Sequence, residues 1–168
     1  SVMLVSQLDN DTRARAEAWF QAQPGKALVH DKAAHSRDSA PRQSRFLRHM
    51  MGMPLEEKNV YKEMTEVDDF LVAPWYLRME YMDLTEAWDN GVHYLVFSDF
   101  TFGRYAYGAT LKDQNPKIYE RDRQYKKIFQ CPVIEFQPEH RSFAYTSPLV
   151  RVVDLKECVL DEKQAGEQ

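Results

Sequence analysis

The sequence predicts an α+β fold in which N-terminal helices pack on a mostly antiparallel sheet of about five to six strands. Two observations lead to this prediction. Apolar residues recur at helical spacing through roughly the first 70 residues, and alternating apolar runs separated by turn signals follow. Helices followed by strands, instead of alternating with them, are typical of the segregated α+β class.

The length and composition predict a single domain. The chain has 168 residues, 43% of them hydrophobic, and shows neither an internal repeat nor a linker. This is the usual size of one domain with one core. We therefore predict one domain over residues 1–168, with a polar tail from about residue 161 that frays.

The first predicted helix spans residues 11–23. Asp11 can cap an alanine-rich run, and Pro24 and Gly25 end it. The short apolar run 26–30 then predicts an edge strand.

The next segment reads as a loop and two helices. Residues 31–44 are polar and predict a loop, and residues 46–51 carry apolar side chains at helical spacing. A further helix is predicted to begin at Pro54, because proline suits the first helical position. Its apolar stripe would be Val60, Met64 and Val67.

A hairpin is predicted around Asn90 and Gly91. Residues 77–82 alternate between apolar and polar side chains, and residues 92–100 form a second apolar run. An Asn-Gly pair favours the type I′ turn, which needs positive φ at both central positions. In that register Asp89 lies opposite Val92, and Tyr81 lies opposite Phe100.

A third, tyrosine-lined strand is predicted over residues 104–111. Side chains alternate along a strand, so Tyr105 and Tyr107 would share one face. The small residues Ala106 and Gly108 would leave open backbone on the other face, for a ligand or a packed helix.

The last part of the chain predicts one helix and three strands. Pro116 begins a helix whose apolar side includes Tyr125 and Phe129, and Cys131-Pro132 ends it. The strand candidates are residues 133–136, 142–146 and 149–155.

The two cysteines, Cys131 and Cys158, predict small buried thiols in a reducing compartment, with a bridge between them as the less favoured alternative. No apolar run reaches the roughly 18 residues that a membrane helix needs, and the first residues do not resemble a signal peptide. We therefore predict a cytoplasmic protein with no membrane partner.

A metal site is one candidate for chemistry. If the segment were helical, Asp31, His35 and Asp38 would share a face, with His30 beside them. Imidazole and carboxylate ligands suit zinc, manganese or iron. The alternative interpretation is a solvated surface loop. The chain carries no glycine-rich phosphate or dinucleotide motif, and we predict no cofactor.

A basic stripe is the second candidate. Arg42, Arg45 and Arg48 recur every three residues, within a stretch, residues 37–49, that could bind nucleic acid or another anionic partner. More often, such a stripe is simply the solvent-exposed face of a helix whose other face is core. The net charge of −4 argues against a general nucleic-acid binder.

These patterns favour a non-enzymatic binding or adaptor domain of an intracellular assembly. Tyrosine, tryptophan and arginine are the usual anchors of protein interfaces, so Trp88, Arg104, Tyr105 and Tyr107 are the expected contacts with a protein partner, and the arginine stripe is a second surface. Two alternatives stay open: a small metal-dependent enzyme with a phosphate-containing substrate, and a nucleic-acid-binding domain.

Overall fold

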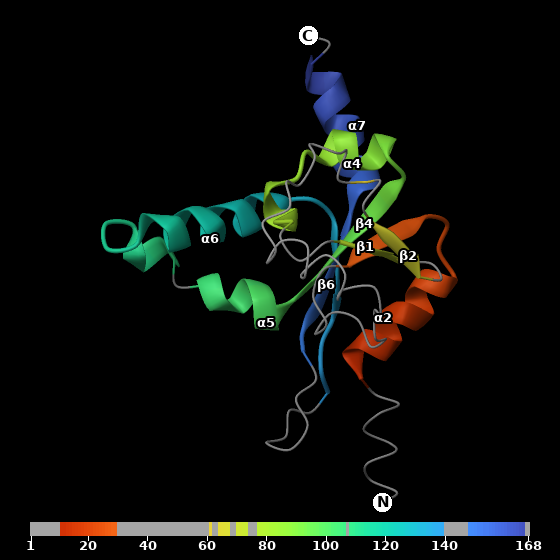
Figure 1. The fold of residues 1–168 in the computed structure, drawn as a ribbon, viewed down its shortest axis with the longest axis horizontal. Coiled ribbons are helices and arrows are strands. Elements are labelled where there is room, and N and C mark those ends of the chain that lie inside the picture. Colours follow the sequence, from red (N-terminus) through yellow and green to blue (C-terminus); the bar gives the residue numbers. More distant parts are fainter. Residues whose placement is uncertain are drawn as a thin grey trace, which may run out of the picture.

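A six-stranded mixed sheet forms the centre of the molecule (Figure 1). The computed structural model describes residues 11–29, 61, 64–67, 70–73, 77–106, 108–139 and 148–166. Within these residues the strand order is β2-β3-β1-β4-β6-β5. The strands are β1 (Lys26–Val29), β2 (Thr65–Val67), β3 (Phe70–Val72), β4 (Val92–Ser98), β5 (Val133–Phe136) and β6 (Val150–Asp154).

The α+β class is confirmed, but the sheet is mixed. β1 runs parallel to both β3 and β4, while the β2–β3, β4–β6 and β5–β6 pairs are antiparallel. The parallel pairs place β1 in the middle of the sheet, so the prediction of an edge strand is wrong. Its last three residues, from Ala27 to Val29, are at most 2% exposed, as expected for a strand covered on both faces.

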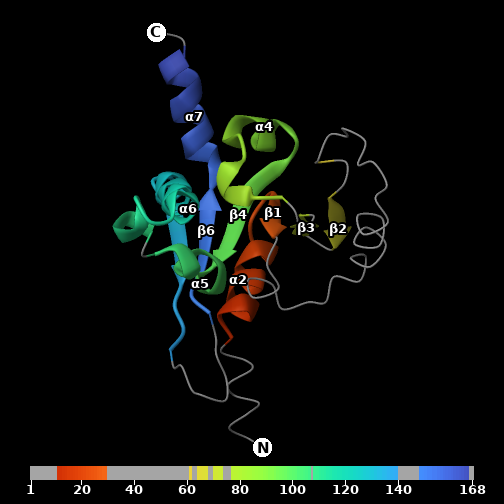
Figure 2. The ribbon, with the colours of Figure 1, turned by 60° about the vertical axis from the view of Figure 1, so that its left-hand side comes forward.

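Helices cover both faces of the sheet (Figure 2). On one face α2 (Thr12–Gln21) packs Ala16 and Phe20 against β1, β3, β4 and β6. On the other face lie α4 (Leu84–Asp89), α6 (Pro116–Ile128) and α7 (Leu155–Gly166). The second face is therefore covered by helices from the C-terminal half, and not by N-terminal helices as predicted.

Both predicted helix ends of α2 hold to within a residue or two. The Asp11 side chain accepts a hydrogen bond from the Arg13 backbone N–H at 2.8 Å, which caps the helix. The helix predicted from Pro54 is wrong in its last part, because Thr65–Val67 is strand β2. The predicted helix 46–51, the loop 31–44 and the helix from Pro54 as far as residue 60 lie outside the described residues.

The predicted hairpin at Asn90-Gly91 is wrong, because these residues end a helix. Asp83 accepts a hydrogen bond from the Glu86 N–H and caps α4, which runs to Asp89. Gly91 has φ +87°, and its N–H donates to the Trp88 carbonyl at 3.0 Å. Glycine at positive φ ends helices as readily as it forms tight turns. The predicted strand 77–82 contains instead the 3₁₀ turn η2 (Met79–Tyr81).

The predicted third strand, residues 104–111, is also wrong. After β4 the chain forms α5 (Asp99–Phe102), followed by the 3₁₀ turns η3 (Gly103–Tyr105) and η4 (Gly108–Leu111). The rings of this segment pack against α6: Phe102 lies 5.2 Å from Phe129, and Tyr105 lies 5.8 Å from Tyr125. Contacts with a helix across the core, rather than pairing with a neighbouring strand, determine its conformation.

The C-terminal elements follow the prediction more closely. α6 begins at Pro116, where Asn115 caps it, and β5 and β6 lie within the predicted ranges. The candidate strand 142–146 lies outside the described residues. α7 runs to Gly166, so the polar tail from about residue 161 is helical, and the fraying of this tail stays a prediction.

Cys131 and Cys158 form a disulfide, so the prediction of two free thiols is wrong. The pairing of β5 with β6 explains it. Val133 lies opposite Val153, and the Asp154 N–H donates to the Pro132 carbonyl at 3.0 Å. This register brings Cys131, at the end of α6, next to the first turn of α7, which carries Cys158.

Candidate functional site

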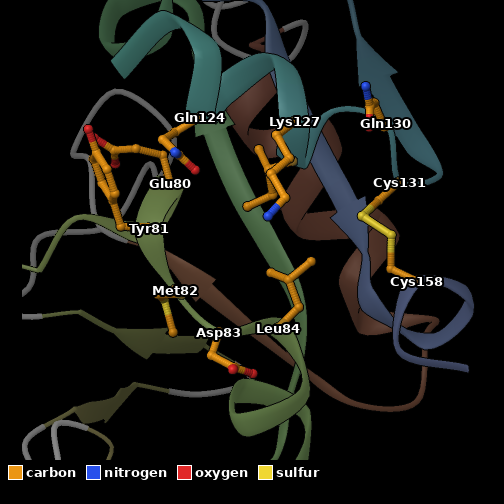
Figure 3. A pocket seen from close by; sticks show the side chains of 11 residues that line it. Glu80, Tyr81, Met82, Asp83, Leu84, Gln124, Lys127, Gln130, Cys131 and Cys158 are labelled. Carbon is orange, nitrogen blue, oxygen red and sulfur yellow. A yellow bond between two sulfur atoms is a disulfide. The ribbon is translucent and has the colours of Figure 1, made fainter. Parts of the chain in front are cut away.

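A pocket of about 380 Å³ opens beside the C-terminal end of α6 (Figure 3). Three parts of the chain enclose it: the segment from η2 to the start of α4, the last two turns of α6, and the disulfide. Its lining mixes apolar and polar side chains: Glu80, Tyr81, Met82, Asp83, Leu84, Gln124, Lys127, Ile128, Gln130, Cys131 and Cys158.

The pocket floor includes a buried ion pair. The Glu80 side chain is 3% exposed and pairs with Arg121, whose Nε donates to the carboxylate at 2.7 Å. Arg121 also donates to the Tyr105 hydroxyl, and its guanidinium lies over the Tyr105 ring at 4.2 Å from the ring centre. The pair ties η2 to α6 and so positions the wall of the pocket.

The groups packed around Glu80 stay in fixed charge states. Burial raises the pKa of the Tyr125 phenol above its ordinary value, and the nearby Glu80 carboxylate raises it further. Burial alone would lower the pKa of Arg121, but the Glu80 carboxylate outweighs it, and the pKa is raised. Tyr125 therefore stays neutral and Arg121 stays charged at physiological pH.

Among the described residues that line the pocket, Lys127 is the one with a cationic side chain. Its neighbours on α6 are engaged: Arg123 pairs with Glu120, and Lys126 pairs with Asp122. Among the described residues, Lys127 has no ion-pair partner. Figure 3 shows its side chain reaching from α6 into the space between η2 and the disulfide.

The two carboxylates of the pocket and one of its amides already have partners. Glu80 is held by Arg121, and Asp83 caps α4 through the Glu86 N–H. The Gln124 side chain donates to Glu120 at 2.6 Å. The pocket therefore offers a ligand an available positive charge beside an apolar lining.

None of the described residues predicted as binding contacts lines this pocket. Trp88 is half-buried, packs against the core and meets the His93 ring edge-on at 4.7 Å. Tyr105 is half-buried beneath Arg121, and Arg104 is exposed. The remaining predicted site residues, Tyr107, Arg42, Arg45, Arg48, His30, Asp31, His35 and Asp38, lie outside the described residues.

Gly108 makes a close approach, but to a helix and not to a ligand. A Cβ at this position would lie 2.5 Å from Asp122 Cβ and 2.9 Å from the Ile118 carbonyl oxygen of α6. Of the two uses foreseen for open backbone here, the packed helix is the one the structure contains.

Substituting Gly108 with alanine is therefore expected to lower the free energy of unfolding by about 1–3 kcal/mol, because η4 and α6 must move apart. Thermal unfolding followed by circular dichroism measures the loss. The control is Gly91→Ala, where no atom lies within 4 Å of the added Cβ and only the positive φ opposes it; this should cost about 1–2 kcal/mol. Equal stability of Gly108→Ala and the unsubstituted protein would contradict the packing.

The pocket residues escaped the sequence analysis because a strand was predicted where η2 and α4 lie. One signal could have found them. Asp83 followed three residues later by Glu86 is the pattern of a helix N-terminus, and a helix there would have turned Tyr81 and Leu84 toward a common site. Lys127 carries no such signal, being one of several charged residues of α6.

Across the described ranges, no three His, Cys, Asp or Glu side chains lie close enough together to hold a metal ion. In the same ranges, no helix combines the length and the apolar character needed to cross a bilayer. In comparisons with protein-family models, curated proteins and solved structures, none matches this chain.

Proposed function

We propose that this chain is a binding domain whose pocket beside α6 receives an apolar group with an adjacent negative charge, presented by a protein partner. The single observation that carries the proposal is Lys127, a cation with no ion-pair partner among the described residues, in a pocket whose two carboxylates are already hydrogen-bonded. Lys127 is exposed, so its ammonium group is accessible to an incoming negative charge at the pocket.

The size of the pocket supports the proposal. Ligand pockets measure roughly 300–1,000 Å³ and combine an apolar lining with a few polar groups that fix orientation. A pocket of about 380 Å³ is at the small end of this range. It suits one side chain with its neighbouring carboxylate better than a large cofactor.

The rim of the pocket supports a protein partner. Tyr81 is 43% exposed, and it and Leu160 are the large hydrophobic side chains exposed among the described residues. Tyrosine at the edge of a pocket is a frequent anchor of protein interfaces, because its ring buries apolar area while its hydroxyl stays hydrogen-bonded. We therefore propose Tyr81 and Lys127 as the contact residues, in place of Trp88 and Tyr105.

Reversing the charge of Lys127 tests the proposal. A library of short peptides that end in an apolar residue with a free carboxylate is screened against the protein, and the best binder is titrated by calorimetry. Lys127→Glu is expected to weaken its binding about 10-fold or more, because a charge-assisted hydrogen bond contributes about 1.5–3 kcal/mol. Amidating the peptide's carboxylate should weaken its binding to the unsubstituted protein by a similar factor. The same amidation should change binding to the Lys127→Glu variant little.

The matched control is Lys117→Glu, which makes the same charge reversal on an exposed residue of α6. Ten residues of helix separate the two lysines by about 15 Å, so this variant should bind like the unsubstituted protein. A failure to find any binder, or equal weakening by both reversals, would refute the pocket as the binding site.

The cytoplasmic location stays a prediction, and the state of the two cysteines no longer supports it. It relied partly on two free thiols, whereas Cys131 and Cys158 are joined. Structural disulfides persist mostly in oxidising compartments. The metal-dependent enzyme and the nucleic-acid-binding domain also stay predictions, because their residues lie outside the described ranges.

A further inference from the structure

The disulfide forms part of the pocket wall, where a ligand can reach it. Both Cys131 and Cys158 line the pocket, and Figure 3 shows their two sulfur atoms on the side opposite Glu80. Their exposure differs. Cys131 is 7% exposed and belongs to the core, whereas Cys158 is only partly buried. An incoming group in the pocket therefore reaches Cys158 more easily than Cys131.

Lys127 lines the same pocket as these sulfur atoms. A negatively charged ligand held by the ammonium group would therefore lie in the same pocket as the disulfide. A thiolate is itself negative, and a positive charge nearby raises its local concentration. Access to a disulfide sulfur and the fraction of attacking thiolate both control the rate of thiol–disulfide exchange.

We propose that the pocket is a thiol–disulfide exchange site for small thiols that carry a carboxylate. The inference rests on the proposed function in one respect, namely that Lys127 recognises a negative charge in this pocket. It goes further by assigning a covalent step to Cys158.

The step balances as follows. The thiolate of the ligand forms a bond to Cys158 Sγ, and the bond between Cys158 and Cys131 breaks. Cys131 leaves as a thiolate and takes a proton from water. The ligand sulfur is oxidised, Cys131 is reduced, and the product is a mixed disulfide at Cys158. No other oxidant or reductant takes part.

The mixed disulfide would also regulate partner binding. The attached ligand fills the pocket between η2 and α6, where the partner's charged group is proposed to lie. Cleavage also removes the covalent link between the end of α6 and the first turn of α7. Exchange therefore switches the pocket from an open to an occupied state.

The test compares two small thiols, 3-mercaptopropionate and the uncharged 2-mercaptoethanol, on the folded full chain with its disulfide intact. Samples are quenched by alkylation, mass spectrometry of the intact protein measures the adduct, and peptide mapping locates it. Rate constants are expressed per thiolate, because the two thiols differ in pKa. The carboxylated thiol should react about 5-fold faster, the effect of one ion pair of about 1 kcal/mol, with its adduct on Cys158.

The variants separate recognition from general reactivity. Lys127→Glu should abolish the preference for the carboxylated thiol, and Lys117→Glu should retain it. Circular dichroism before and after the reaction establishes that the folded protein reacts. Equal rates for the two thiols in the unsubstituted protein, or an adduct mainly on Cys131, would overturn the inference.

The peptide titration distinguishes this inference from the proposed function. If peptides bind in a Lys127-dependent way but the two thiols react equally, the exchange site is wrong and the binding site stands. If the carboxylated thiol is preferred but no peptide binds, the exchange site stands and the protein partner is wrong.

Discussion

Substituting Arg121 with methionine is expected to lower the free energy of unfolding by about 3–5 kcal/mol, the usual cost of removing one member of a buried ion pair. The reason is the position of its partner. The Glu80 side chain is 3% exposed, so without Arg121 its charge stays buried and unpaired. The Tyr105 hydroxyl loses its donor as well. Urea unfolding at neutral pH measures the loss.

Replacing the other member of the pair, Glu80, should lower the free energy of unfolding by less. The Arg121 side chain is 23% exposed, so in Glu80→Gln the guanidinium keeps a neutral hydrogen-bond partner and part of its contact with water. We expect a loss of about 1–2 kcal/mol. The double variant Glu80→Leu with Arg121→Met should recover much of the stability, because apolar replacements of a buried pair are often neutral.

Arg123→Met is the control on the same helix. Its pair with Glu120 lies at the surface, where the Arg123 side chain is 64% exposed, and such pairs contribute less than about 1 kcal/mol. If Arg121→Met proved no more destabilising than Arg123→Met, the buried pair would not be what holds η2 against α6.

Substituting Phe97 with alanine is expected to cost about 3–5 kcal/mol, the range for removing a fully packed aromatic ring. Phe97 is 3% exposed on the central strand β4. Its ring meets Tyr125 at 5.7 Å and Phe129 at 5.6 Å, both edge-on. Denaturant unfolding measures the change, and Phe97→Leu should cost clearly less because most of the volume is kept.

This substitution tests whether the Phe97 ring belongs to the core or to an exposed surface. On a binding surface, loss of the ring would change stability by less than about 0.5 kcal/mol, and that result would contradict the core described here. Tyr81→Ala, at the exposed rim of the pocket, is the matched control. It should change the free energy of unfolding little while weakening the binding of the peptide.

Elements with strong local signals could be predicted from the sequence. α2 and α6 have a capping residue before a periodic apolar pattern. β4 could be predicted because a continuous apolar run marks a strand buried on both faces.

Elements whose local sequence is compatible with two different conformations could not be predicted. Asn90-Gly91 suits a type I′ turn or the end of a helix, and the choice depends on Asp83 capping α4 upstream. Residues 104–111 alternate like a strand, yet Tyr105 packs on Tyr125 in another element. A local sequence pattern does not show such contacts across the core. Because the β-propensity scale spans only about 1 kcal/mol, tertiary packing can outweigh it.

The candidate site was the least predictable feature because it is assembled from distant segments. η2, the end of α6 and the start of α7 are brought together by the Glu80–Arg121 pair, the β5–β6 register and a shared apolar core. The same register makes the disulfide. Without it, two cysteines separated by 27 positions in the sequence gave no reason to expect a bridge.

The central place of β1 has a consequence for how the chain reaches its native state. Ala27 pairs with Phe70 on one side and with Tyr94 on the other, and Tyr94 in turn pairs with Asp154. During synthesis β1 therefore emerges long before either neighbour. Pairings between segments far apart in sequence slow folding, because loop entropy is lost before contacts are gained. β1 is thus the first strand to be synthesised and has no complete set of neighbours until β4 follows, and until then its apolar edges need protection from other chains.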